Sequence, residues 1–374
     1  MKCFEKLVRN CILSCLPVGP DPYQFAYKAK RSTEDAVAMA LYADLTHLEK
    51  QGNYTRLLFV DFSSAFNTIL PHRLVPKLLD LGLPPCLCRW ILDFLSNHSQ
   101  RVRLGSHVSA DLITNTGMPQ GCVLSPLLYT LYTADCAPKY PSNKIIKFTN
   151  DTTVVGLITA GEGEAAYRKE VEQLGEWCRK NNLLLNLKKT KEIIVDFRKC
   201  KLNIQPLIIE GKCVEQVSVF RFLGMELRDD LTWGENSKDL VKRAQQRLYF
   251  LRILRKNNLS KELLVAFYHC TVECILTYGL CVWFGSCMAR EKTMLSRVVK
   301  TAERIIGCTL STLDQIYAAR CHKKAAEIAQ DSTHPRNDLF QLLPSGRRYR
   351  VIKARTSCLR NSFYANAILV LNAA

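Results

Sequence analysis

Residues 56–66 read RLLFVDFSSAF, residues 118–126 read MPQGCVLSP, and residues 145–159 read IIKFTNDTTVVGLIT. The first stretch is a short apolar run that ends in the acid Asp61, as expected of a buried strand. The last has two β-rich runs around a Thr-Asn-Asp tip, which predicts a hairpin with Asp151 at its turn. The middle stretch predicts a glycine turn that leads into a helix over residues 125–136. Together they predict two acidic strand ends with a turn and a helix between them.

The flanking sequence predicts a chain that is α+β first and mostly α later. Residues 34–50 have apolar positions at the spacing of an amphipathic helix, with Thr33 as a possible cap. Further helices are expected over residues 73–80, 86–97 and 163–182, a hairpin over 101–117, and strands over much of 183–223. The charge-free stretch 274–288 predicts a buried core helix, since it is short for a membrane span of about 20 residues.

The order of a strand-end acid, a glycine turn onto a helix, and a hairpin tip with a second acid resembles motifs A, B and C of a reverse transcriptase palm. The likeness extends to residues 24–33, QFAYKAKRST, which resemble the segment before motif A in LINE-type, non-LTR retrotransposon polymerases. Residues 181–197 are similar to their motif D, and FRFLGMEL (220–227) to motif E, the primer grip. The chain is therefore identified as a member of the LINE-type class.

This resemblance implies a right-hand polymerase palm, an antiparallel sheet backed by helices, with partial fingers and a mostly helical thumb and C-terminal region. Residues 1–54 would be a remnant of the fingers, and residues 55–215 the palm with motifs A to D. Residues 216–235 would form the motif E hairpin, and residues 236–374 the basic helical thumb and C-terminal region.

The implied reaction is RNA-directed DNA synthesis, in which two Mg²⁺ ions about 3.5–4 Å apart stabilise the attacking and leaving oxygens. Mg²⁺ prefers hard oxygen ligands, so carboxylates on neighbouring strands suit it. The resemblance implies that Asp61 and Asp151 bind metal, and that Lys189 protonates the departing pyrophosphate. It assigns nucleotide binding to Phe62, Phe66, Gln120 and Gly121, with Phe66 rejecting a 2′-hydroxyl. Nucleic-acid contacts would come from Arg31, Phe222, Leu223, Gly224, Arg243 and Arg247.

Position 150 departs from the family pattern. Motif C of active relatives carries two consecutive acids, of which the first binds metal, and here that first position is Asn150. An amide keeps an oxygen ligand but lacks the negative charge that two close divalent cations require. Neighbouring strand residues point to opposite faces, so Asp151 would aim away from the metals unless the hairpin tip is irregular. We therefore expect weakened metal binding and impaired polymerisation.

The start of the chain also departs from the family, because MKCFEKLV begins partway through what resembles motif 2. The upstream fingers strands that hold the incoming triphosphate are thus expected to be missing. No endonuclease or ribonuclease H pattern accompanies the palm. Three interpretations stay open: an RNA-directed DNA polymerase, an inactive RNA- or DNA-binding protein that kept the fold, and a pseudogene product without a selected role.

The charge of the chain indicates a polyanionic partner. There are 52 Lys+Arg and 34 Asp+Glu, a net charge of +18, and residues 236–374 hold 23 basic and only 9 acidic side chains. Residues 242–256, KRAQQRLYFLRILRK, predict a helix with Arg243 and Arg247 on one face, suited to a duplex backbone or merely solvated. The run GRRYRVIKAR (346–355) could grip single-stranded RNA or be a plain basic loop.

The expected partners are therefore an RNA template, a DNA primer and deoxynucleoside triphosphates, with no membrane and an unknown oligomeric state. Seventeen cysteines without a CxxC pair predict free, mostly buried thiols and not a zinc site. The N-terminal apolar run is interrupted by Arg9 and Asn10, which argues against a signal peptide. An intracellular protein of the cytoplasm or nucleus is expected.

Overall fold

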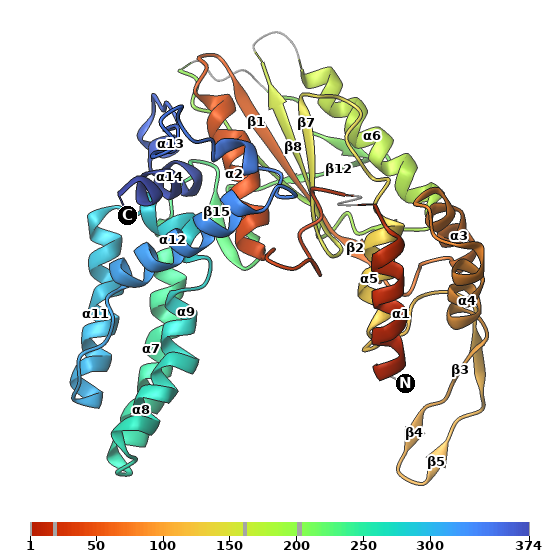
Figure 1. The fold of residues 1–374 in the computed structure, drawn as a ribbon, viewed down its shortest axis with the longest axis horizontal. Coiled ribbons are helices and arrows are strands. Elements are labelled where there is room, and N and C mark those ends of the chain that lie inside the picture. Colours follow the sequence, from red (N-terminus) through yellow and green to blue (C-terminus); the bar gives the residue numbers. More distant parts are fainter. Residues whose placement is uncertain (1, 18–20, 160–162, 200–203, 374) are drawn as a thin grey trace. The chain divides into compact units, whose positions relative to one another are not determined.

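The computed structural model describes residues 2–17, 21–159, 163–199 and 204–373. The chain divides into two compact units, whose helices and strands are labelled in Figure 1. The first comprises Met1–Ser32, Arg56–Glu192 and Leu202–Gln216. The second comprises Thr33–Thr55, Ile193–Lys201 and Val217–Ala374.

The largest sheet that the structure describes has five strands. Its strand order is β13-β10-β1-β8-β7. The strands are β1 (Tyr54–Val60), β7 (Asn143–Phe148), β8 (Asp151–Ile158), β10 (Lys191–Val195) and β13 (Glu215–Gln216). β7 and β8 form an antiparallel hairpin, whereas β10 and β13 pair in parallel. All seven residues of β1 are buried, as expected of a central strand covered on both faces.

A buried arginine ties this sheet to a helix. Arg56 on β1 has no exposed surface, and its guanidinium donates to both carboxylate oxygens of Glu192 on β10, at 2.9 and 2.7 Å. Tyr167 of α6 (Glu164–Lys180) donates its hydroxyl to the same carboxylate at 2.7 Å. A buried ion pair is tolerated only when its remaining hydrogen-bonding capacity is satisfied. The network therefore fixes β1, β10 and α6 relative to one another.

Helices of the first unit pack beside the sheet and beside one another. They are α1 (Lys2–Cys15), α3 (Pro71–Asp80), α4 (Pro85–Leu95), α5 (Leu124–Tyr132) and α6 (Glu164–Lys180). Both α3 and α4 begin with proline at the first helical turn, where the missing N–H costs nothing. α3 contacts α4 and α5, α1 contacts α5, and α6 contacts β8.

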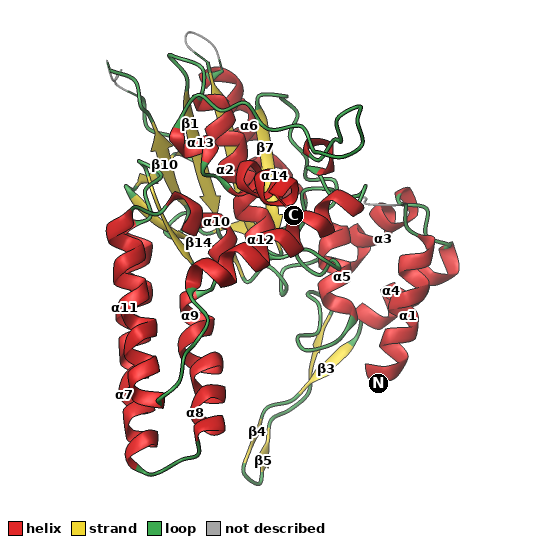
Figure 2. Ribbon diagram, turned by 60° about the vertical axis from the view of Figure 1, so that its left-hand side comes forward, coloured by secondary structure: helices red, strands yellow, loops and turns green. Residues whose placement is uncertain are grey.

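Four short strands form a ribbon that projects from the first unit (Figure 2). β3 (His98–Gln100) pairs with β6 (Leu112–Thr114), and β4 (Arg103–Leu104) with β5 (His107–Val108). Its apolar side chains are largely exposed, including Val102 at 73% and Leu104 at 79%. Two further pairs complete this unit: β2 (Phe62–Ser63) with β9 (Leu184–Leu185), and β11 (Ile208–Ile209) with β12 (Lys212–Cys213).

The second unit is mostly helical. It contains α2 (Thr33–Leu48) and the hairpin of β14 (Val219–Phe222) and β15 (Met225–Arg228), followed by α7 (Gly234–Lys256) and α8 (Lys261–Tyr268). Its other helices are α9 (Cys274–Leu276), α10 (Leu280–Trp283), α11 (Ala289–Ile306), α12 (Leu313–Gln330), α13 (Ser357–Arg360) and α14 (Phe363–Ala373). The π-helical segment His269–Glu273 and the 3₁₀ segments Phe284–Ser286 and Asn337–Leu339 connect them. α7 packs against α8 and α11, and α12 against α14.

Three expectations from the sequence are wrong. Residues 35–45 of α2 are all buried, so this helix belongs to the core and is not amphipathic. Residues 274–288 do not form one helix, because the chain breaks between α9 and α10, where Gly279 has a left-handed φ of +64°. The described cysteines are free, as expected, but seven are exposed and only five are buried.

Among the described residues, no single helix is long and apolar enough to cross a membrane. One bent pair, Lys261–Leu276 with Leu280–Ser286, meets the length and composition criteria together, with a bend of 42°.

Candidate active site

Asp61 lies directly after β1, where the central strand leaves the sheet. Its backbone is held by the segment that follows α6. The Asp61 N–H donates to the hydroxyl of Thr190 at 3.3 Å, and Asn186 N–H donates to the Asp61 carbonyl at 2.8 Å. The adjacent β2–β9 pairing sets Phe62 opposite Leu185. The stretch 181–190 thus braces the backbone on both sides of the acid.

Asn150 and Asp151 lie at the tip of the β7–β8 hairpin. Phe148 pairs with Asp151, so Thr149 and Asn150 form a two-residue turn and Asp151 opens β8. The alternation argument against Asp151 therefore does not apply, because Asn150 belongs to the turn and not to a strand. β8 is the neighbour of β1, so Asp151 opens the strand that pairs with the one directly before Asp61.

The pKa of the Asp151 carboxyl is affected by the neighbouring charge of Asp61. Loss of hydration raises the pKa of the Asp151 carboxyl, and the negative charge of Asp61 raises it further. Two like charges that approach each other disfavour simultaneous ionisation. A cation bound between them would remove this repulsion.

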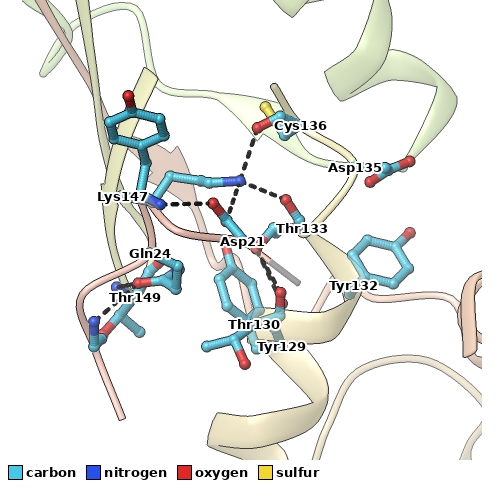
Figure 3. Close-up of polar contacts among 12 residues, drawn as sticks. Asp21, Gln24, Tyr129, Thr130, Tyr132, Thr133, Asp135, Cys136, Lys147 and Thr149 are labelled. Atoms are coloured by element: carbon cyan, nitrogen blue, oxygen red, sulfur yellow. Dashed lines mark hydrogen bonds and ion pairs between the residues drawn. The ribbon is translucent and has the colours of Figure 1, made fainter. Parts of the chain in front are cut away.

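The hairpin turn is held by residues from the start of the chain (Figure 3). The side chain of Gln24, only 1% exposed, accepts from Thr149 N–H at 3.1 Å and donates to the Thr149 carbonyl at 3.4 Å. Residues 23–25 run along β7, with Phe25 N–H donating to the Lys147 carbonyl at 2.9 Å. The segment 21–26 therefore supports the strand and the turn that precede Asp151.

Lys147 is a buried cation beneath the same hairpin. Its ammonium group pairs with the Asp21 carboxylate at 2.7 Å and donates to the carbonyls of Thr133 at 2.7 Å and Cys136 at 2.8 Å, as Figure 3 shows. The ammonium group thus makes two hydrogen bonds and one ion pair, which lets a charge that is 2% exposed persist. This cluster fixes β7 against the end of α5.

The loop before α5 approaches the chain that follows Asp61. Met118 N–H donates to the Phe66 carbonyl at 2.9 Å, and the Gln120 amide donates to the Asn67 side chain at 3.2 Å. Gly117 has φ +85°, and a Cβ there would lie 3.0 Å from the Asn67 backbone, so this close approach requires glycine. Gly121 follows in the same turn.

An open pocket of about 790 Å³ lies against this loop. Its polar lining includes Asn67, Gln100, Thr116 and Gln120. Glu5 of α1 reaches it as well, and its carboxylate accepts from Val123 N–H at 2.5 Å at the start of α5. A carboxylate at a helix N-terminus is favourably placed for the helix dipole. α1 thus stabilises the helix that follows the glycine turn.

Two aromatic rings connect the loop to the acids. Phe66 is half-buried and stacks on Tyr129 of α5, with ring centroids 4.6 Å apart. Burial raises the pKa of the Tyr129 phenol, and the charge of Asp151 is among the smaller contributions in the same direction. Tyr129 is therefore near both Phe66 and Asp151. Phe62, in contrast, is 7% exposed and packs in the core.

The other predicted residues of the first unit are less tightly placed. Lys189 is exposed, and its backbone N–H donates to the Asn186 carbonyl at 3.1 Å, one residue before the Thr190 contact to Asp61. Arg31 is half-buried in the loop before α2, and its guanidinium donates weakly to the Lys30 carbonyl at 3.5 Å.

The remaining predicted residues belong to the second unit. Leu223 and Gly224 form the turn between β14 and β15, and Tyr278 donates its hydroxyl to the Leu223 carbonyl at 2.8 Å. Phe222, the last residue of β14, is buried at 4% exposure.

On α7, the two predicted arginines differ. Arg243 pairs with Asp239 at 3.3 Å, so part of its charge is neutralised within the helix. Arg247 is exposed, and no side-chain partner is found for it among the described residues.

The site supplies only part of the negative charge that two divalent cations require. Asp61 and Asp151 supply two mutually repelling carboxylates, and an amide oxygen at Asn150 is adjacent in sequence. Within the described ranges, no group of three or more His, Cys, Asp or Glu side chains could hold a metal ion. The site thus offers two acids where a third charged ligand would strengthen binding.

Four supporting residues were missed in the sequence: Glu5, Gln24, Tyr129 and Lys147. Gln24 contacts a residue 125 positions away, and Glu5 one 118 positions away. No local pattern signals such partners. Lys147 carried the one usable signal, since it stands between the apolar residues Ile146 and Phe148, and a buried lysine requires a partner.

Comparison with known proteins now identifies the family. The sequence model described as "Reverse transcriptase (RNA-dependent DNA polymerase)" matches residues 1–227. A second model, for the N-terminal region of alkylated DNA repair protein alkB homolog 8, matches residues 233–274.

Curated relatives are mobile-element proteins of fruit flies. The chain is 27% identical over 296 residues to a probable RNA-directed DNA polymerase from transposon BS of Drosophila melanogaster, covering 75% of this chain and 32% of the relative. It is 24% identical over 322 residues to the RNA-directed DNA polymerase from mobile element jockey of the same species, covering 82% and 34%. The chain thus spans about a third of the length of these relatives.

Among solved structures, telomerase from Candida tropicalis has a similar backbone trace, with a TM-score of 0.46 at 12% identity. The similarity covers 89% of this chain and 60% of the telomerase chain. An RNA-dependent RNA polymerase of a human picobirnavirus has a TM-score of 0.40 at 10% identity, covering 85% and 54%. These overall similarities are loose, and the assignment rests on the sequence model that covers more than half of the chain. The resemblance and the α+β polymerase fold expected from the sequence are confirmed: the chain belongs to the reverse transcriptase family, as a domain of the LINE-type, non-LTR class.

Proposed function

We propose that this chain carries the polymerase site of an RNA-directed DNA polymerase, with Asp61 and Asp151 as its acidic pair. The observation that carries the proposal is the placement of these two acids at the ends of neighbouring strands, where the charge of Asp61 raises the pKa of Asp151. Mg²⁺, when bound, would neutralise charge on the reacting phosphates of a deoxynucleoside triphosphate. An RNA template and a DNA primer are the corresponding partners, which agrees with the net charge of +18.

In this proposal each protein group has one task. Asp61 and Asp151 would hold the metal, and Asn150 would supply a neutral amide oxygen in place of the third acid. Phe66, supported by Tyr129, limits the space beside the sugar of the incoming nucleotide, while Phe62 is buried in the core. Gln120 and Gly121 face the template and nucleotide from the turn before α5. Lys189 donates a proton to the departing pyrophosphate.

We further propose that residues 55–215 act as the palm, residues 216–235 as the primer grip, and residues 236–374 as the thumb and C-terminal region. Residues 1–54 would then be what this chain has of the fingers. Phe222, Leu223 and Gly224 would contact the primer, and Arg31, Arg243 and Arg247 nucleic-acid phosphates. Of the two arginines on α7, Arg247 is the freer to do so, because Arg243 pairs with Asp239. The protein would carry out these tasks in the cytoplasm or in the nucleus.

Asn150 favours a second candidate function, a nucleic-acid-binding protein without polymerase activity. The amide removes one of the charges that would offset two divalent cations. Under this alternative the basic helices of residues 236–374 would still bind nucleic acid, while nucleotide addition would be very slow or absent.

Primer extension on an RNA template with Mg²⁺ separates these candidates. The wild-type chain is expected to extend weakly, and Asn150→Asp to extend at least tenfold faster by restoring the missing charge. Asn150→Ala is the matched control and should be no better than wild type. Asp61→Asn in the Asn150→Asp background should abolish extension.

Two results would contradict the polymerase proposal. One is the absence of extension by Asn150→Asp while nucleic-acid binding persists, which favours the binding protein. The other is extension that survives Asp61→Asn, which would mean that the reaction does not use this acidic pair.

A further inference from the structure

A second basic feature lies outside the proposed polymerase site, in residues 341–350, here named the arginine hairpin. Its sequence is QLLPSGRRYR. From residue 339 to the end of the chain there are six basic residues and no acidic one. Such a composition is by itself compatible with a plain solvated loop, so the geometry decides what the segment can do.

The backbone of the arginine hairpin is ordered by its own hydrogen bonds. Leu342 and Tyr349 form an antiparallel bridge, flanked by bonds from Leu343 N–H to the Arg348 carbonyl at 2.7 Å and from Arg350 N–H to the Gln341 carbonyl at 2.8 Å. Gly346 N–H donates to the Leu343 carbonyl at 2.8 Å and closes the turn. The segment is therefore a short β-hairpin with a defined register.

The rest of the second unit holds this hairpin in place. Asn372 of α14 clamps Tyr349, accepting from its N–H at 2.7 Å and donating to its carbonyl at 3.0 Å. The Tyr349 ring also packs edge-on against Phe340, with centroids 6.3 Å apart. A few residues on, Glu49 accepts from Thr356 N–H at 2.9 Å. One face of the hairpin is thus anchored through Tyr349.

The arginines occupy the other face. Side chains alternate along an extended strand, so Arg348 and Arg350 lie on the face opposite Tyr349, about 7 Å apart along the chain. Arg347 lies beside them at the turn. All three are exposed, and no side-chain partner is found for any of them among the described residues. The hairpin thus presents three guanidinium groups on an ordered backbone, and no described residue pairs with them. Such an arrangement is suited to binding an anionic partner.

The neighbouring side chains indicate which polyanion fits. Leu343, which faces Arg348 across the hairpin, is 38% exposed on the arginine face, whereas Leu342 and Val351, 53% and 50% exposed, lie on the face of Tyr349. Unpaired bases can contact apolar side chains while their phosphates meet the guanidinium groups, whereas a duplex presents only its backbone and groove edges. We propose that the arginine hairpin binds single-stranded nucleic acid, with Arg347, Arg348 and Arg350 on the phosphates. This inference goes beyond the proposed polymerase function and does not depend on catalysis.

Fluorescence anisotropy on the full chain tests it, with labelled oligo(U) and oligo(dT) in EDTA so that no metal-dependent step contributes. The variant Arg347→Ala/Arg348→Ala/Arg350→Ala is expected to bind at least tenfold more weakly near 100 mM salt. The slope of log affinity against log salt should fall by about 2, because each lost single-strand phosphate contact removes about 0.7.

The matched control is Lys261→Ala/Lys300→Ala/Lys323→Ala, which removes the same charge from exposed positions elsewhere in the second unit. It should change the affinity less than threefold. Asn372→Ala should weaken binding while keeping most of the salt slope, since it frees the hairpin without removing charge. Circular dichroism and thermal melting of every variant check that the fold is retained.

Three outcomes would overturn the inference. Equal losses in the hairpin and control variants would mean that only net charge matters. An equal loss of affinity for a blunt RNA duplex would exclude a preference for single strands. Hairpin-dependent binding to phosphatidylserine vesicles, without an effect on oligonucleotides, would assign the surface to a membrane instead.

Discussion

The carboxamide of Gln24 brackets the backbone of Thr149, accepting from its N–H at 3.1 Å and donating to its carbonyl at 3.4 Å. The same Gln24 oxygen also accepts from Ala26 N–H at 3.1 Å. One buried side chain therefore holds together the loop before α2 and the turn before Asp151. The turn that contains Asn150 is thus held in place by Gln24, a residue near the N-terminus.

Removing this support should destabilise the first unit. Gln24→Ala leaves the N–H groups of Thr149 and Ala26 without their acceptor, and we expect a loss of about 2–3 kcal/mol in the free energy of unfolding. Urea denaturation followed by circular dichroism measures it. Gln51→Ala, at an exposed glutamine, is the control and should be near neutral. Equal stability of the two variants would show that the Gln24 bonds contribute nothing.

Thr149 itself is strained. Its φ of +59° is left-handed, a conformation that a β-branched residue rarely adopts and that asparagine tolerates better. We expect Thr149→Asn to raise the free energy of unfolding by about 1 kcal/mol. Thr116→Asn is the comparison, since Thr116 is exposed and lacks a positive φ. A melting temperature lowered by Thr149→Asn alone would contradict the strain argument.

The Lys147 cluster should respond strongly to loss of one partner. Lys147→Met leaves the carboxylate of Asp21 buried without its cation, and we expect a loss of about 3–5 kcal/mol in the free energy of unfolding. Adding Asp21→Asn should recover part of this loss, because the orphaned charge disappears.

A double-mutant cycle from urea denaturation measures the coupling, with Lys139→Met at an exposed lysine as the control. Additive effects of the two changes would mean that Lys147 and Asp21 do not interact in the folded protein.

Asp44 should make stability depend on pH. It lies in α2 with no exposed surface, and the nearby Thr55 hydroxyl offsets only part of the cost of removing its carboxylate from water. Burial raises the pKa of Asp44 to about 8. Between about pH 4, where the unfolded chain loses this proton, and pH 8, the folded state retains it. The free energy of unfolding should therefore fall as pH rises, by up to about 1.4 kcal/mol per pH unit from this group.

Asp44→Asn should remove this slope and make the protein more stable than wild type at pH 8. Denaturation series at pH 5, 6, 7 and 8 compare the two, with Asp80→Asn at an exposed acid as the control. If the free energy of unfolding has the same pH slope in wild type and in Asp44→Asn, Asp44 is not the group that causes the slope.

The influence of Asp61 on Asp151 predicts a shifted titration of Asp151 when Asp61 is replaced. Because the charge of Asp61 contributes to the raised pKa of Asp151, Asp61→Asn should lower that pKa. Carbon-13 NMR of the aspartate carboxyl groups, assigned with Asp151→Asn, follows it. Glu176→Gln, an exposed acid on α6, should leave the titration unchanged. An Asp151 titration insensitive to Asp61→Asn would place the two carboxylates too far apart to share a cation.

The features that could be predicted from the sequence are those whose signal lies within a few neighbouring residues. Asp61 and Asp151 stood out because acids at the ends of apolar runs leave a signature within a few residues. Tyr129 did not, since a tyrosine in an apolar helix looks like any core residue until Phe66 is stacked on it. The helix over 34–50 was found, but not that it is covered on all sides, because burial depends on segments far away in the chain. The break at Gly279 was missed because composition suggested a continuous apolar helix.

The projecting ribbon of β3–β6 has a practical consequence for anyone preparing this protein. Exposed Val102 and Leu104 give separate molecules an apolar edge on which to associate. Gln100 and Leu112 face each other in the β3–β6 register, so the eleven residues between them can be replaced by an Asn-Gly turn. The shortened protein should keep both compact units, remain monodisperse at higher concentration, and be the better starting point for crystallisation.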